Sequence, residues 1–278
     1  MRIRVGALSV VACLLASAAR ADWEIAVHGG PTFPFYEQSI AFDPGPISGA
    51  GGAVITQSGE YRLDGRGGLS LGAALAYHPH PAVGIELRVD TADVDVRTGG
   101  SSYRVRVPVP PFGTFDSTVS FTSGEGDLER LRPVSLNLRL RSPGAFRVTA
   151  SGGVSYLPVF RFAIRQPIAA GFGSGGPQVE VAQILLPAEA LPEQEGDGRW
   201  GINGGIGLQV PIGARLHIQA DGRYFTFQRQ TLYWGEPQAT GALTPLEDEL
   251  VREITARLDP ARFSPTFFQA TVGVALSF

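Results

Sequence analysis

The amino-acid sequence predicts an all-β fold, an eight-stranded antiparallel up-and-down barrel, and three observations lead to it. Eight segments alternate apolar residues with small or polar ones, which is the two-residue period of a β-strand. Tight and long connections between these segments alternate along the chain. Aromatic residues gather near the ends of the segments, on their apolar faces.

Each of the eight segments has one apolar face and one polar face. In the third, Ile85, Leu87 and Val89 alternate with Glu86 and Arg88. The last segment has about the 9–11 residues that a tilted strand needs to cross a bilayer. The predicted strands cover residues 23–35, 68–78, 82–96, 134–141, 146–156, 200–210, 215–224 and 268–278.

The connections between the predicted strands fall into two groups. Three are tight turns, at residues 78–81, 142–144 and 211–214. Four are long, starting near Tyr36, Arg97, Arg165 and Gly235. Because the two kinds alternate, an up-and-down barrel places all the tight turns at one rim and all the long loops at the other. Outer-membrane barrels have this asymmetry, with short periplasmic turns and long extracellular loops.

Alternation alone does not say which face points inward, because a soluble lipocalin-type barrel turns its apolar face to the centre. Three features favour a transmembrane barrel. The polar face mixes charges of both signs with glycine and alanine, which suits a narrow, filled interior. Cys13 is the single cysteine, so a mature chain without it forms no disulfide. The aromatic residues form two girdles, as expected at two bilayer interfaces: Trp23, Tyr77, Phe146 and Phe278 near the tight turns, and Tyr156, Trp200, Tyr224 and Phe268 near the loops.

The N-terminus predicts export. Arg2 and Arg4 precede an apolar stretch that ends in a small-x-small cleavage site, so residues 1–21 are expected to be a signal peptide cleaved after Ala21. Residues 22–278 then form one outer-membrane barrel domain with both termini in the periplasm. No basic patch with interleaved aromatics is present, which argues against nucleic acid as a partner.

By this pattern the chain resembles the small outer-membrane barrels of the OmpA type and the OmpW type. Phe278, an aromatic residue at the end of the last strand, is similar to the signal that the barrel-assembly machinery reads in such proteins. The resemblance implies a monomer surrounded by outer-membrane lipid, with long loops where an extracellular partner would bind. No peptidoglycan-binding domain is expected, since the strand that ends at Phe278 is the last segment.

The inward-facing polar residues are the first candidate site. They would form either a mutually paired plug, which we favour because buried charges need partners, or a narrow channel for small solutes, with a preference for anions because arginines outnumber acids. The set consists of Glu86, Arg88, Asp90, Asn137, Arg139, Arg141, Arg147, Arg215, His217, Asp221 and Arg223.

Catalysis is a weaker hypothesis. Some eight-stranded barrels are lipid A deacylases with a serine two residues after a histidine, but here Gln219 follows His217 in that place. Asp221 would lie about 13 Å along the same strand, too far to orient His217. His78 and His80 flank Pro79 in a tight turn and are expected in solvent rather than on a metal, and His28 is expected to lack a partner. We therefore expect no catalytic, cofactor or metal site, and a structural or surface-interaction role.

The long loops contain three features of their own. Residues 245–258 predict a helix that folds over the barrel mouth or against another loop; docking to a partner or to lipid headgroups is the alternative. Residues 102–109 and 115–122 predict a hairpin that continues the third and fourth strands. The third loop, glycine-rich at 171–176, is expected to be flexible and solvated.

Overall fold

The computed structural model describes residues 22–40, 45–46, 52–57, 61–108, 110–121, 123–128, 130–158, 162–172, 179–189, 198–240 and 243–278. The predicted signal peptide and its cleavage site lie outside these residues. Among the described residues no helix is long and apolar enough to cross a membrane.

The described chain is almost entirely antiparallel β-structure, as predicted, and contains nineteen strands and one helix. Strands at or near all eight predicted positions pair in a succession that returns to its start: β1–β5–β6–β10–β11–β14–β15–β19–β1. Their bounds are β1 Asp22–Pro34, β5 Tyr61–His80, β6 Val83–Thr98, β10 Val134–Arg141, β11 Arg147–Leu157, β14 Arg199–Pro211, β15 Leu216–Phe227 and β19 Thr266–Ser277.

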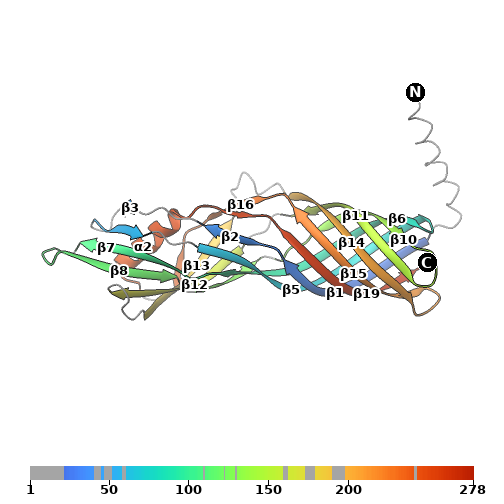
Figure 1. Ribbon diagram of the computed structural model, residues 1–278, viewed down its shortest axis with the longest axis horizontal. Helices are drawn as coiled ribbons and strands as arrows, with labels where there is room; N and C mark the ends of the chain where they lie inside the picture. Colours follow the sequence, from blue (N-terminus) through green and yellow to red (C-terminus); the bar gives the residue numbers. More distant parts are fainter. Residues whose placement is uncertain are drawn as a thin grey trace, which may run out of the picture.

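The three tight connections lie at the same end of this ring as the C-terminus (Figure 1). The turn between β10 and β11 is built on Gly144, whose φ of 109° lies in the left-handed region that side chains other than glycine disfavour. The four long connections at the opposite end contain all eleven other strands of the described chain.

Six of these additional strands extend the ring away from the tight turns. They are β2 Glu37–Ile40, β9 Glu125–Leu128, β12 Phe162–Phe172, β13 Val179–Glu189, β16 Gln230–Trp234 and β18 Ala261–Phe263. Together with the ends of β5 and β6 that lie far from the tight turns, they pair in the order β2–β5–β6–β9–β12–β13–β16–β18. β18 lies beside β2, where the backbone N–H of Arg262 donates to Oε1 of Gln38 at 2.8 Å. The expectation of a flexible third loop is wrong for residues 162–172 and 179–189, which form the paired strands β12 and β13. Residues 173–178 and 190–197, which hold most of the glycine-rich and acidic stretches, lie outside the described residues.

The far end of the molecule is a smaller layer that includes a helix. β7 (Ser101–Pro108) and β8 (Thr114–Phe121) form the predicted hairpin, which pairs with β4 (Val54–Gln57) on one side and β12 on the other. β3 (Gly45–Pro46) pairs with β4, and β17 (Gln238–Thr240) with β13. The helix α2 (Pro245–Ala256) packs its buried Val251 and Ile254 against this layer. The predicted helix therefore folds against other loops, and it ends two residues earlier than expected.

Two different interiors follow each other along the molecule. The polar-cored section is the ring from the tight turns up to Asp90 on β6 and Arg223 on β15, and its inward side chains are mainly charged or polar. The apolar-cored section lies beyond, and its packed side chains include Tyr36, Tyr61, Leu63, Val94, Val96, Leu157, Ile164, Leu186, Phe225, Phe227, Leu232, Phe263 and Phe267. Burial raises the pKa of Tyr36 and of Tyr61, so both phenols stay protonated; Tyr61 donates to Oε1 of Gln166 at 2.8 Å.

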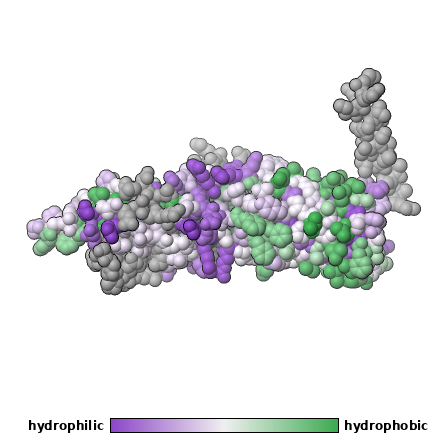
Figure 2. All heavy atoms as spheres, in the orientation of Figure 1, coloured by the Kyte–Doolittle hydropathy of each residue, from purple (hydrophilic) through white to green (hydrophobic). Residues whose placement is uncertain are grey.

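The outer surface changes at the same level as the interior. Around the polar-cored section it is apolar; around the apolar-cored section it is polar. In Figure 2 the green residues gather on the right-hand part of the molecule, among white ones, and a strongly hydrophilic band lies to their left, near the middle of the molecule.

Candidate functional site in the polar interior

The strand β6 shows how the sequence builds the polar interior. Glu86, Arg88 and Asp90 are buried and point inward, while Leu87 and Val89 between them are each 46 % exposed on the outside. Because side chains alternate across a strand, the two-residue period places every charged residue of this stretch on the same face. The neighbouring strands contribute inward residues in the same way.

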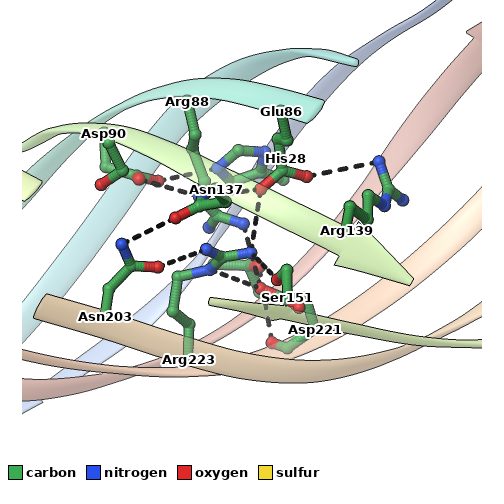
Figure 3. A network of polar contacts seen from close by, with 12 residues as sticks. His28, Glu86, Arg88, Asp90, Asn137, Arg139, Ser151, Asn203, Asp221 and Arg223 are labelled. Carbon is green, nitrogen blue, oxygen red and sulfur yellow. Dashed lines mark hydrogen bonds and ion pairs between the residues drawn. The ribbon is translucent and has the colours of Figure 1, made fainter. Parts of the chain in front are cut away.

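Arg223 on β15 is the centre of the interior network (Figure 3). It is 1 % exposed, and its Nη2 lies 3.1 Å from Oε1 of Glu86. Its Nη1 donates to Oδ1 of Asn203 at 2.6 Å, its Nη2 also donates to Oγ of Ser151 at 2.6 Å, and its Nε lies 3.3 Å from Oδ1 of Asp221. One guanidinium group thus joins β6, β11, β14 and its own strand across the interior.

A second set of contacts lies nearer the apolar-cored section. Arg88 lies 2.8 Å from Oδ2 of Asp90 and 3.0 Å from Oδ1 of Asp221. Asp90 in turn lies 2.8 Å from Nε2 of His28 on β1. The expectation that His28 lacks a partner is therefore wrong. β1 and β6 both pair with β5, and His28 and Asp90 lie on either side of Gly72 of β5, which has no side chain to separate them.

A third set lies nearer the tight turns. Nη1 of Arg139 is 2.7 Å from Oε1 of Glu24 and 3.3 Å from Oε2 of Glu86. Gln209 donates to the same Glu24 oxygen at 2.9 Å. Arg141 donates its Nε to the carbonyl of Pro81 at 2.6 Å, and its Nη2 lies 3.3 Å from Oδ2 of Asp22.

These contacts connect opposite charges from one end of the polar interior to the other. A buried charge that loses its partner costs about 3–5 kcal/mol, so each member strongly constrains the others. The space enclosed by Glu86, Arg88, Arg139 and Arg223 is a cavity of about 10 Å³, which is about enough for a single water molecule. The geometry favours a paired plug over an open path.

Not every predicted interior residue joins this network. Asn137 does, donating to Oε1 of Glu86 at 3.0 Å. Arg215 does not: it is exposed, because β15 begins one residue later and Arg215 belongs to the turn. Within the described part of the chain, Arg147 is half-buried with Nη1 unpartnered, and His217 is buried with Nδ1 unpartnered.

Several network members are not among the residues that the sequence pattern singled out. Glu24, Ser151, Asn203 and Gln209 are buried or partly buried and bonded within the network. The strand period could have found them, since Glu24 shares a face with His28, and Asn203 and Gln209 lie opposite the outward Ile202 and Leu208. His78 is also fully buried rather than solvated, while Nδ1 of His80 accepts the backbone N–H of Ala82.

The predicted girdle residues lie on the outer surface, some in contacting pairs. Trp23 and Tyr77 have ring centroids 4.8 Å apart near the tight turns, and Tyr156 and Trp200 have theirs 5.2 Å apart toward the loops. Phe33 and Phe268 pair at 6.4 Å, and Phe35 and Tyr224 at 6.1 Å, also toward the loops. Phe146 and Phe278 are exposed at the tight-turn end.

The chemistry available in the interior is electrostatic pairing. Asp221 is engaged by Arg88 and Arg223, so it does not orient His217. No group of three or more His, Cys, Asp or Glu side chains with metal-binding geometry is found in the part of the chain that the structure describes.

An antiparallel ring with an ionic interior and an apolar exterior is typical of membrane β-barrels. No family model matches the chain, and no curated protein matches it. Among solved structures, it is similar to the outer membrane protein OprG from Pseudomonas aeruginosa, with 12 % identity, a TM-score of 0.39, and coverage of 92 % of this chain and 95 % of that one.

Two further solved structures show a similar degree of likeness. A major outer membrane protein from Thermus thermophilus has 11 % identity, a TM-score of 0.41, and coverage of 93 % of this chain and 100 % of that one. The outer membrane protein AlkL, solved in lipid bilayers, has 14 % identity, a TM-score of 0.32, and coverage of 93 % and 90 %. At these scores, the case for a membrane location depends on the chain's own surface.

Proposed function

We propose that this chain is an outer-membrane protein, an eight-stranded transmembrane barrel closed to solutes that carries a folded head at the cell surface. The polar-cored section would span the membrane, with tight turns in the periplasm and the apolar-cored section outside the cell. The observation that supports this best is the joint inversion: where the exterior is apolar the interior is ionic, and where the exterior is polar the interior is apolar.

The exposed apolar surface is the first part of the case. The outward side chains of the ring strands include Ile85, Leu136, Leu138, Ile202, Ile206, Val272 and Val274, all among the exposed large hydrophobic residues. Such a continuous apolar band is unfavourable in water but is the surface that hydrocarbon requires. The aromatic pairs toward both ends of the band match the positions of two membrane interfaces.

The closed interior is the second part. The ion-paired network fills the polar-cored section, and the packed aromatic and aliphatic side chains fill the section above it. A solute would have to displace both. A structural or surface-interaction role without catalysis is therefore the proposal, with any partner binding at the head; the resemblance to small barrels of the OmpA and OmpW types agrees with such a role.

Orientation can be tested with two cysteine variants, since residues 22–278 contain no cysteine. Ser102→Cys is exposed on β7 in the head, and Ala145→Cys is exposed in the turn before β11. A membrane-impermeant maleimide added to intact cells should label Ser102→Cys alone. Ala145→Cys should react only after the outer membrane is permeabilised. Labelling of Ala145→Cys in intact cells, or equal labelling of both, would contradict the orientation.

Closure is tested separately by single-channel recording in planar bilayers. We expect no reproducible unitary conductance from the purified protein, because both the ionic network and the apolar core obstruct the interior. Stable conductance steps would overturn the closed barrel and favour the channel, whatever the labelling experiment shows.

A further inference from the structure

The tight-turn end of the polar interior contains an arginine without a counter-charge. Arg147 lies on β11 opposite Gln209 of β14. It is half-buried, it makes no ion pair or hydrogen bond with any residue that the structure describes, and its Nη1 is shielded from solvent. This differs from Arg139, which bonds to two glutamates, and from Arg223, which bonds to four side chains.

Arg141 lies beside Arg147 and is also incompletely bonded. Thr149 is directly opposite Arg141 across the β10–β11 pair, so Arg147 occupies the diagonal position next to it. The two guanidinium groups are close enough to repel each other. Arg141 uses Nε for Pro81 and Nη2 for Asp22, which leaves its buried Nη1 without a partner among the described residues.

The acids and the histidine nearby compensate at most one of these two positive charges. Asp22 is engaged by Arg141, and Glu24 by Arg139 and Gln209. His78 is fully buried and lies near Arg141, and neither of its ring nitrogens has a hydrogen-bond partner in the described chain. The end of the interior therefore holds an excess positive charge and unpartnered donors on neighbouring side chains.

We propose that Arg141 and Arg147 form a binding site for one anionic group, a phosphate or a carboxylate, which enters from the tight-turn end. A water molecule would satisfy the hydrogen bonds but would leave the two positive charges repelling each other. An anion with two or more oxygens accepts these hydrogen bonds and also compensates the positive charge, since guanidinium groups bind carboxylate and phosphate through charge-assisted hydrogen bonds. Arg147 is the half-exposed member and meets the ligand first.

The test measures binding of inorganic phosphate to the purified protein in a zwitterionic, phosphate-free detergent by titration calorimetry, with acetate as the carboxylate probe. The wild-type protein should bind at least one of the two saturably. Arg147→Gln should weaken binding at least tenfold; it removes no ion pair, so it should fold, which heat-modifiable electrophoretic mobility verifies. Arg147→Lys should retain part of the affinity, since it keeps the charge but loses the two-pronged geometry.

Arg215→Gln is the matched control, because Arg215 lies at the same end of the ring but is exposed and outside the site. It should bind as the wild type does. Equal losses in Arg147→Gln and Arg215→Gln would overturn the site and point to diffuse surface charge. Titration with phosphatidylglycerol in the same detergent distinguishes a lipid headgroup from a free anion: saturable binding that requires Arg147 and appears only with this lipid identifies a headgroup phosphate. Absence of saturable binding in every arm overturns the proposal.

Discussion

The polar-cored and apolar-cored sections differ in chemistry although strands run through both without interruption. On β6 the inward residues change from Glu86, Arg88 and Asp90 to Ala92, Val94 and Val96. The outward residues change from Ile85, Leu87 and Val89 to Asp93, Asp95 and Arg97. One unbroken strand thus turns polar side chains inward before Thr91 and apolar side chains inward after it.

With the proposed membrane location of the polar-cored section, the surrounding medium, rather than the strand, decides which side chains a sheet turns inward. In water a sheet buries its apolar face, and the hydrophobic effect stabilises the core. In hydrocarbon nothing is gained by burying leucine, so the interior is held by ion pairs and hydrogen bonds that lipid does not supply. The two sections therefore depend on different interactions and should respond differently to the same kind of substitution.

The largest contrast is expected from the centre of the network. Arg223→Met should lower the free energy of unfolding by about 3–5 kcal/mol, because Glu86 and Asp221 lose a buried partner. Urea titration in detergent or lipid, followed by electrophoretic mobility, measures the loss. Arg215→Met should change stability by less than about 0.5 kcal/mol, since that side chain is exposed. Similar losses in both variants would mean that the interior contacts contribute little.

An arginine scan along the outward face of β6 sharpens the position of the boundary. Leu87→Arg should cost about 2–4 kcal/mol, because the side chain enters hydrocarbon, and Thr91→Arg much less. Asp95→Arg should be close to neutral, since its side chain already faces water in the head. The same unfolding measurement in lipid vesicles gives the profile. A flat profile along all three positions would contradict the membrane boundary.

A smaller effect is expected from the bulge in β5. Between Gly67 and Ser70 the strand gains one residue relative to β6, which moves its inward face from the odd-numbered Tyr61 and Leu63 to the even-numbered Ser70 and Ala74. A Cβ on Gly68 would lie 2.6 Å from the carbonyl oxygen of Asp93. Gly68→Ala should therefore cost about 1–3 kcal/mol through forced backbone shifts.

Gly213→Ala is the control for the bulge variant, because its added Cβ would meet only Leu216 at 3.9 Å, an ordinary contact. It should leave the unfolding free energy within about 0.5 kcal/mol of the wild type. A neutral Gly68→Ala would show that the backbone near the boundary relaxes easily, and the bulge would then not be a fixed element.

The period of the sequence located the ring strands well, since a two-residue alternation is a local property. Residues 134–141 were predicted to the residue, and β14 and β19 to within two residues at either end. The alternation did not predict strands that depend on distant partners. β12 and β13 lack a clean alternation; they pair with each other, and β12 also pairs with β8 and β13 with β16. His28 was expected to lack a partner because Asp90 is 62 positions away.

By itself, the order of residues determined the antiparallel strand content, the segregation of charge from apolar side chains, and the tight turns, because each depends on neighbours a few positions apart. Ring closure determined the rest: which arginine meets which acid, that Arg147 meets none among the described residues, and that the loops build a second core. Those outcomes depend on distances between residues far apart in the chain, which are set only when the last strand pairs with the first.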